Sequence, residues 1–132
     1  MYLPFFPLKL VVFPGEELNL HIFEPRYKEL LADVEQNGNT FGICVYLNTL
    51  SGFGTEVRLE KVIKRYEDGR LDISTRGLRP FKILSFENPI PGKLYAGGNV
   101  EFLADDPKIT TVQHYEYVFY LKEMLYLLNY QV

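Results

Sequence analysis

The ten residues Leu18-Asn19-Leu20-His21-Ile22-Phe23-Glu24-Pro25-Arg26-Tyr27 contain the change of hydrophobic period that sets the local fold. In the first half, Leu18, Leu20 and Ile22 alternate with other residues, which is the period of a β-strand with one buried face. At Pro25 the alternation stops, and proline is favoured at the first position of a helix because its missing N–H has no partner there. This stretch therefore predicts a strand that leads directly into a helix.

The apolar residues after Pro25 recur at three- and four-residue spacing, which places them on one face of an α-helix. They are Tyr27, Leu30, Leu31 and Val34. Asn37-Gly38 follows, and glycine accepts the left-handed conformation that commonly ends a helix. The sequence predicts one amphipathic helix between Pro25 and Asn37.

Most of the remaining chain reads as strands separated by turn signals. Residues 3–23 read as strands broken by proline, with an apolar run at 8–13, and further strands are expected at 41–47, 55–66, 71–75, 78–86 and 95–103, with residues 48–54 as a loop. Asp68-Gly69 is a hairpin signal, the alternation slips at Lys61-Val62-Ile63 as in a β-bulge, and Pro80 favours a strand edge or a bulge. So many strands around one inserted helix indicate a mainly β (α+β) domain built as a small barrel or pseudo-barrel.

Residues 112–130 predict a final helix whose apolar residues occupy all sides rather than one stripe. A helix that is apolar all round is normally surrounded by protein. Two explanations stay open: a longer natural protein is cut after Val132, or a second copy covers this helix. We therefore expect a β domain at residues 1–108 and a C-terminal helical segment at residues 109–132, through which the chain could form a homo-oligomer.

Composition and charge argue against several classes of protein. The chain has 132 residues, a net charge of −3 and a pI of about 5.4, whereas nucleic-acid binding normally requires a basic surface. Its aromatic content of 15% suits either a core or an interface. The apolar N-terminus lacks the basic region of a signal peptide, and no segment is long and uncharged enough to span a bilayer. We expect a cytoplasmic protein with no membrane partner.

The sequence contains no group of residues that predicts catalysis, a metal site or a cofactor. The single cysteine, Cys44, lies in an apolar run and is expected to be a buried hydrophobic residue. The two histidines, His21 and His114, have no Cys/His cluster beside them, whereas zinc needs three or four converging ligands. Gly92-Lys93 lacks the upstream glycine and the following hydroxyl residue of a phosphate-binding loop. We expect a protein that is not an enzyme and needs no cofactor.

Ordered motifs in about the first hundred residues resemble those of the Lon protease N-terminal domain family. They are Leu3-Pro4-Phe5-Phe6-Pro7-Leu8, Val12-Phe13-Pro14-Gly15, the stretch 18–27 quoted above, Phe41-Gly42-Ile43, Gly54-Thr55, Asp68-Gly69-Arg70, Gly77 with Arg79 and Phe81, and Tyr95-Ala96. Two positions depart from the family pattern. Asn19 stands where proline is usual, and Pro80 falls within the arginine–phenylalanine segment.

The resemblance implies a PUA-like β pseudo-barrel, of the kind also found in standalone bacterial proteins, without the ATPase and peptidase domains of Lon. It further implies a non-catalytic module that binds unfolded or client polypeptide, with a role as an adaptor in protein quality control. Two alternatives stay open. PUA-like folds also bind RNA, and the apolar final helix could make the chain a self-associating structural domain.

The candidate peptide-binding residues fall into two groups. Arg26 and Lys28 lie at the start of the predicted helix, which the resemblance implicates in substrate handling, although a structural ion pair at the helix end explains them as well. Four aromatic residues could form pockets for a peptide that pairs with a strand edge, or could equally belong to the core. They are Phe5, Phe6, Phe53 and Tyr95.

Overall fold

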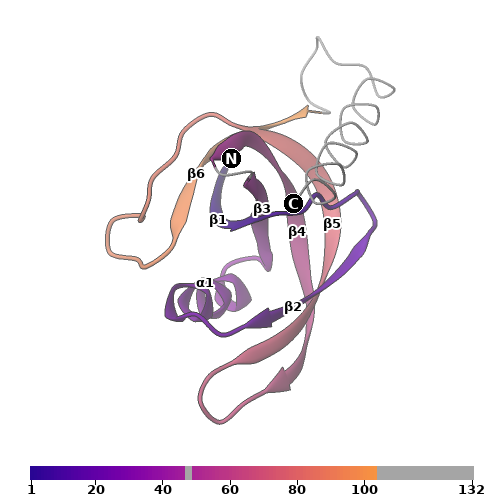
Figure 1. Cartoon of the computed structure of the whole chain (residues 1–132), viewed down its shortest axis with the longest axis vertical. Helices are drawn as coiled ribbons and strands as arrows, with labels where there is room; N and C mark the ends of the chain where they lie inside the picture. The colour runs from indigo at the N-terminus through magenta and orange to yellow at the C-terminus, as the bar shows by residue number, and fades with distance from the viewer. Residues whose placement is uncertain (47–48, 104–132) are drawn as a thin grey trace.

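The computed structural model describes residues 1–46 and 49–103 of the chain. Within these residues it contains a six-stranded mixed sheet and one helix (Figure 1). The elements are β1 (Tyr2–Leu8), β2 (Glu17–Ile22), α1 (Pro25–Gln36), β3 (Thr40–Tyr46), β4 (Leu50–Arg65), β5 (Leu71–Ile83) and β6 (Ala96–Phe102). The predicted C-terminal helix at residues 109–132 and the boundary after residue 108 lie outside the described residues.

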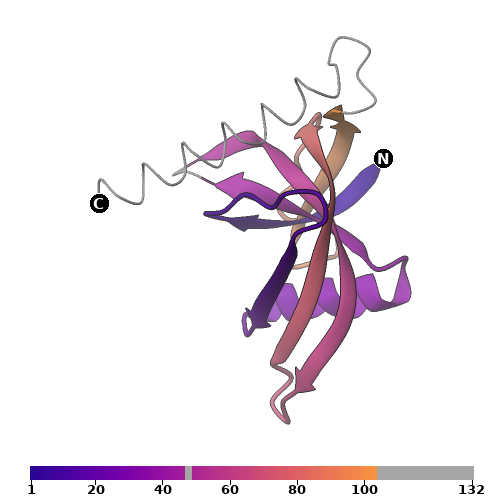
Figure 2. The ribbon, with the colours of Figure 1, turned by 90° about the vertical axis from the view of Figure 1, so that its right-hand side faces the viewer.

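The sheet closes into a ring because β5 pairs with three strands. The strand order is β2-β5-β4-β3-β1-β6, and β5 also pairs with β6. β1 and β3 are parallel, and the other pairs are antiparallel. β5 holds β2 through residues 71–76 and β6 through residues 81–83, and Figure 2 shows β4 and β5 as two long strands running side by side. This arrangement confirms a mainly β fold with one helix.

The helix α1 forms where the change of period predicted it. It begins at Pro25, and the preceding Glu24 is extended (φ −78°, ψ 141°), as the residue before a proline normally is. Its buried side chains are Tyr27, Leu30, Leu31 and Val34. At the other end, the Asn37 N–H donates to the carbonyl of Val34 (3.3 Å), and Gly38 takes a φ of 99° that favours glycine.

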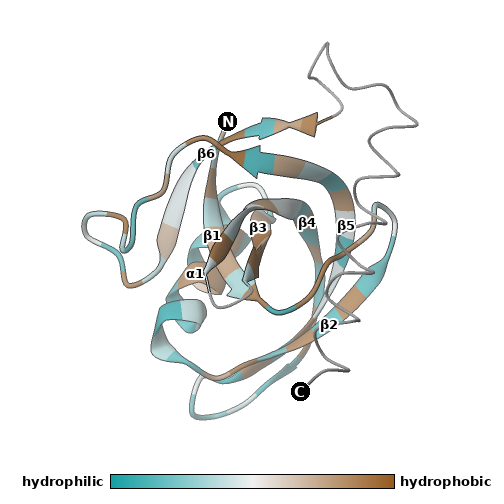
Figure 3. Cartoon of the chain, turned by 45° about the horizontal axis from the view of Figure 1, so that its top comes forward, coloured by the Kyte–Doolittle hydropathy of each residue, from teal (hydrophilic) through white to brown (hydrophobic). Residues whose placement is uncertain are grey.

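Alternate residues of β1 and β3 face two different apolar clusters, because successive side chains of a strand point to opposite faces. Phe6 and Phe41 belong to the larger cluster, which contains the buried face of α1. Phe5 and Cys44 belong to a smaller cluster around Phe81. β3 is therefore apolar on both faces, and it lies in the wall of the ring between β1 and β4 (Figure 3).

Gly42 of β3 and Gly54 of β4 make room for the ring of Phe81, which is fully buried. A Cβ atom at Gly42 would lie 2.7 Å from Cζ of Phe81. A Cβ atom at Gly54 would lie 2.7 Å from the same Cζ and 2.5 Å from the carbonyl oxygen of Ile43. The two glycines therefore allow β5 to pack closely against β3 and β4.

Strands form at both ends of the expected region 3–23, but the strand expected at residues 8–13 is wrong. β1 ends at Leu8, and residues 9–16, which include most of the expected strand 8–13, belong to no strand. The apolar pattern there reflects burial without sheet pairing, because Val12 is buried and its carbonyl accepts a hydrogen bond from the Thr55 hydroxyl (2.8 Å). An apolar run alone does not distinguish these two situations.

β1 accommodates two prolines because each lies where one side of the strand has no partner. The pairing of Met1 with Val100 turns the backbone groups of odd-numbered residues toward β6, and those of even-numbered residues toward β3. The backbone of Pro4 faces β3, but the pairing of β1 with β3 begins only at Phe5. The backbone of Pro7 faces the β6 side, where the pairing of β1 with β6 has already ended at Phe5. Neither missing N–H removes a ladder hydrogen bond.

The pair of β4 and β5 is more continuous than the sequence predicted. β4 begins at Leu50, inside the expected loop 48–54. β5 joins the two expected strands 71–75 and 78–86 into one strand. The alternation breaks at Leu78 because a bulge leaves this residue without a paired residue in β4. Such bulges occur without ending a strand.

Three local predictions in this region are confirmed. The register shifts between Leu59 and Lys61 and again between Val62 and Lys64, around the expected bulge. Asp68-Gly69 forms the hairpin turn, with a φ of 91° at Gly69. Pro80 lies between the part of β5 that pairs with β2 and the part that pairs with β6, so it occupies a locally open edge.

The loop before β6 is fastened to α1 through Asp33. The Tyr95 hydroxyl donates to Oδ2 of Asp33 (2.5 Å), and Nζ of Lys93 lies 2.8 Å from the same oxygen. The hydrogen bonds from Lys93 and then Tyr95 lower the pKa of the Asp33 carboxyl. The Leu94 N–H between these two residues donates to Glu29 (3.1 Å). These contacts bring residues 93–95 against the helix.

We expect Gly42→Ala and Gly54→Ala each to lower the free energy of unfolding by about 1–3 kcal/mol, because both overpack the core. Urea denaturation measures the loss. In a Phe81→Leu background the cost at Gly42 should shrink, since that Cβ meets only side-chain atoms of Phe81 and Phe5. The cost at Gly54 should persist because the Ile43 carbonyl is backbone. Equal relief at both positions would contradict this explanation.

We expect Asp33→Asn to lower the free energy of unfolding by about 1–2 kcal/mol at pH 7, because hydrogen bonds to a charged acceptor are lost. The pKa of Asp33 is lower in the folded protein than the value near 3.8 in the unfolded chain. The carboxylate therefore contributes its full stabilisation at pH values above the unfolded pKa, and this contribution disappears as the pH falls through the lower folded pKa. Urea titrations at several pH values should show the two proteins converging in acid. A difference that stays constant with pH would rule out the Asp33 contacts as its cause.

Candidate functional site

A groove of about 250 Å³ lies where the ends of β1 and β2 meet the start of α1. Its lining is mostly apolar and consists of Phe6, Pro7, Leu8, Leu20, His21, Ile22, Phe23, Glu24, Arg26 and Tyr27. A smaller hollow of about 30 Å³ shares Pro7, Arg26 and Tyr27 with this groove, and it adds Phe86 and Leu94 from the loop before β6. The two hollows are therefore neighbours on either side of Arg26.

The floor of the groove is built from stacked aromatic rings. Phe6 of β1 stacks on Tyr27 of α1 with ring centroids 3.9 Å apart, and both residues are buried. The guanidinium carbon of Arg26 lies 4.6 Å from the Tyr27 ring centroid, within the range of a cation–π contact. Because Tyr27 and Phe6 also belong to the main core, the floor is held by the packing of the whole fold.

The rim of the groove exposes large apolar side chains. Phe23 is 58% exposed, Leu94 56% and Phe86 42%. Phe23 lies at the end of β2, and the other two come from the loop that Asp33 fastens to α1. Phe23 lines the groove, Phe86 and Leu94 line the smaller hollow, and Arg26 and Pro7 line both. A grouped set of exposed apolar residues beside a groove is typical of an interaction surface.

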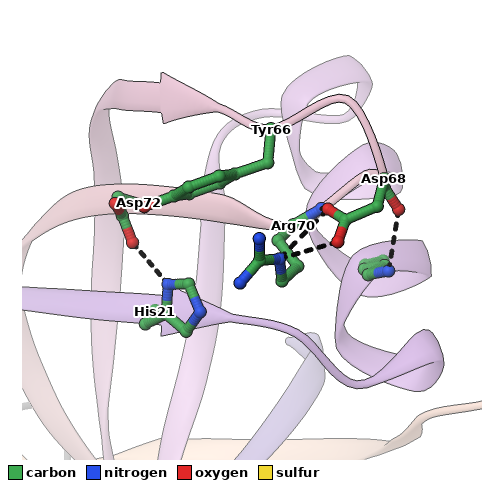
Figure 4. A network of polar contacts seen from close by, with 6 residues as sticks. His21, Tyr66, Asp68, Arg70 and Asp72 are labelled. Carbon is green, nitrogen blue, oxygen red and sulfur yellow. Dashed lines mark hydrogen bonds and ion pairs between the residues drawn. The ribbon is translucent and has the colours of Figure 1, made fainter.

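The charged groups beside the groove are paired with one another. Nε of Arg26 lies 2.9 Å from Oε2 of Glu24. On the outer side of β2, Nδ1 of His21 lies 2.5 Å from Oδ1 of Asp72, whose other oxygen accepts a hydrogen bond from Tyr66 (2.7 Å) (Figure 4). The bonds from His21 and then Tyr66 lower the pKa of Asp72. The groove therefore offers apolar contact more than free charge.

Three of the candidate residues predicted from the sequence meet at this site. Arg26 lines both hollows. Phe6 forms part of the floor, and Phe5 lines the smaller hollow. Phe5 is fully buried, and its ring stacks between Phe81 and Phe86 at centroid distances of 6.0 and 6.1 Å. Its role is to support the rim residue Phe86 from below.

The other three candidate residues lie elsewhere. Lys28 donates from Nζ to the carbonyl of Asp68 (3.1 Å) and so connects α1 to the β4–β5 hairpin. Phe53 lies on β4 opposite Lys82, and it lines neither hollow. Tyr95 is buried with its hydroxyl on Asp33 and lines a separate, more polar hollow of about 200 Å³. The structure does not bring these three residues to the groove.

Sequence reasoning missed the three rim residues Phe23, Phe86 and Leu94. Phe23 carried a usable signal, because it follows Ile22 directly and so adds an apolar residue out of phase with the strand. Phe86 and Leu94 carried none, since their place at the groove depends on how the loop before β6 folds against α1. Exposure of this kind is a property of tertiary structure.

The described residues contain neither a metal-type cluster nor an exposed thiol. They include no group of three or more His, Cys, Asp or Glu side chains close enough to hold a metal ion. Cys44 is buried, and burial raises the pKa of its thiol to about 12, so it carries no thiolate at neutral pH. Helix α1 is too short and too polar to cross a bilayer, and the described part of the chain has no other helix.

The family model described as "ATP-dependent protease La (LON) substrate-binding domain" matches residues 2–128 of the chain. Among solved structures, the Lon N-terminal domain protein from Xanthomonas campestris is 30% identical with a TM-score of 0.67, and the match covers 92% of this chain and 75% of that one. The N-terminal domain of Mycobacterium avium complex Lon protease has the same fold, with a TM-score of 0.63 at 12% identity, covering 93% and 75%.

The family match spans nearly all of the 132 residues, and these residues include no ATPase or peptidase domain. The chain belongs to the Lon N-terminal substrate-binding domain family.

Proposed function

We propose that this chain is a non-catalytic module that binds unfolded or client polypeptide in the cytoplasm through the groove at the start of α1. The observation that carries this proposal is a pair of neighbouring hollows that share Arg26 and Tyr27, with exposed Phe23 lining one and exposed Phe86 and Leu94 lining the other. Unfolded chains expose apolar side chains, and burying them against such a rim is favourable. Membership of a substrate-binding family supports the same function.

The groove suits a broad set of clients rather than one ligand. Its lining is apolar, and its charged residues Arg26 and Glu24 already pair with each other. An adaptor in protein quality control needs this kind of modest, sequence-tolerant affinity. The architecture, a ring-like sheet with one inserted helix, is compatible with the PUA-like classification that the family resemblance implies. RNA binding is the weaker candidate, because the groove carries no unpaired basic residue among its lining side chains.

We expect Phe23→Ser and Leu94→Ser each to weaken binding of a reduced, carboxymethylated and fluorescein-labelled test protein by about tenfold. The reason is the loss of about 1–1.5 kcal/mol of apolar burial from a half-exposed side chain. Fluorescence polarisation measures the affinity. Ile63→Ser is the matched control, since Ile63 is 51% exposed on β4 and lines neither hollow. Equal effects from all three variants would contradict a binding role for the groove.

We expect Arg26→Glu to weaken binding of the same labelled protein about three- to tenfold, because it places a second carboxylate beside Glu24 and removes the guanidinium between the two hollows. Lys28→Glu makes the same change in net charge two residues away, outside the groove. Its affinity should stay within about twofold of the original chain. If the two variants bind equally weakly, the effect comes from net charge and the groove assignment of Arg26 fails.

A further inference from the structure

β2 forms an open edge of the sheet directly beside the groove. Among the described residues this strand pairs only with β5, and its six residues keep one unbroken register with that strand. Leu20 and Ile22 of β2 also line the groove. A strand edge carries a row of backbone N–H and C=O groups that can pair with another extended chain.

The pairing with β5 determines which residues of β2 point their backbone groups outward. The N–H of Gly77 donates to the carbonyl of Glu16 (2.8 Å), so the even-numbered residues that follow turn their backbone groups toward β5. This direction alternates along a strand, and the odd-numbered residues therefore turn theirs away from β5. The outward-facing residues are Glu17, Asn19 and His21.

The open edge of β2 lacks three of the features that commonly prevent pairing with other chains. Proteins protect such edges with proline, lysine or a bulge, and β2 has none of these between Glu17 and Ile22. The strand end across the groove is different, because Pro7 of β1 has no N–H to donate on its open side. An added strand would therefore pair with β2 and not with β1.

The chemistry around β2 favours an apolar occupant. Three polar side chains on or beside this edge already have partners: Arg26 with Glu24, His21 with Asp72, and Glu17 with the hydroxyl of Ser74 (3.1 Å). A charged segment would compete with these contacts. Alternate side chains of an added strand lie on the same face as Leu20 and Ile22, and so enter the apolar groove.

We propose that β2 captures an extended, mainly apolar polypeptide segment as an additional strand, hydrogen-bonded to the outward backbone groups of Asn19 and His21. This inference rests on the proposed function and adds main-chain recognition to it. Client selection would then depend on the ability to become extended as well as on apolar content.

The test compares Asn19→Pro with Asn19→Ala. The probe is a fluorescein-labelled ten-residue peptide of alternating valine and threonine, which favours an extended conformation. Asn19→Ala keeps the outward N–H and should bind within about twofold of the original chain, whereas Asn19→Pro removes that N–H and should bind at least about fivefold more weakly. Proline is tolerated where the N–H of an edge strand faces outward, so both variants should unfold at similar urea concentrations.

A second experiment changes the peptide and leaves the protein intact, so it remains decisive if Asn19→Pro fails to fold. Two versions of the probe carry N-methyl groups on one or the other set of alternate residues. One version should lose most of its affinity, because its donors face β2, and the other should keep it. Equal binding of both N-methylated peptides and the parent peptide would overturn the proposal.

The remaining outcomes separate this inference from the proposed function. If Asn19→Pro binds as well as Asn19→Ala while Leu94→Ser loses affinity, the groove binds polypeptide and the β2 edge does not. If the original chain binds neither the peptide nor an unfolded protein, both proposals fail. If sedimentation shows a dimer that only Asn19→Pro dissociates, the occupant of the edge is a second copy of this chain and the client assignment is wrong.

Discussion

Closure of the sheet by β5 is the constraint on which the rest of the structure depends. One continuous strand holds β2 through residues 71–76 and β6 through residues 81–83. At the closing point, Phe81 fills the space that Gly42 and Gly54 leave open. Because the ring closes between β5 and β6, β2 stays outside the closure with one edge that no other strand of residues 1–46 and 49–103 pairs with, and the groove forms next to that edge.

The parts of the fold that local sequence predicts correctly are those that depend on contiguous residues. The helix from Pro25 needed only its own spacing of apolar residues, and the Asp68-Gly69 hairpin needed only its turn residues. The extent of the strands depended on partners. β5 looked like two strands because the bulge at Leu78 interrupts the alternation, and only pairing with β4 makes it continuous. The loop at residues 9–16 looked like a strand because burial alone produced the same apolar pattern.

The residues of the candidate site also fall into two groups: those that local sequence motifs identify and those that depend on contacts between distant parts of the chain. Arg26 and Phe6 belong to motifs that resemble a known family, so sequence could point to them. Leu94 lies at the smaller hollow in a loop whose residues 93 and 95 contact Asp33 of α1, and Phe86 reaches the same hollow by stacking on Phe5 of β1. No local pattern encodes these contacts. Tyr95 was predicted as a binding residue because it is aromatic. Its hydroxyl instead donates a hydrogen bond to Asp33 and holds the loop before β6 against α1.

Two strand edges beside the groove remain without a partner among the described strands: the outer edge of β2 and the end of β1 beyond Phe5. Pairing β2 with β1 would complete a second ring and satisfy both open edges, but it would fill the groove and bury its rim. Pro7 opposes that closure, because it presents no N–H on the open side of β1. Its fixed φ is compatible with β1 at no loss of a ladder hydrogen bond, whereas a residue with an N–H there would help β1 accept a partner strand. Pro7 therefore offers no backbone donor on the side of β1 that faces the space in which a client segment would lie.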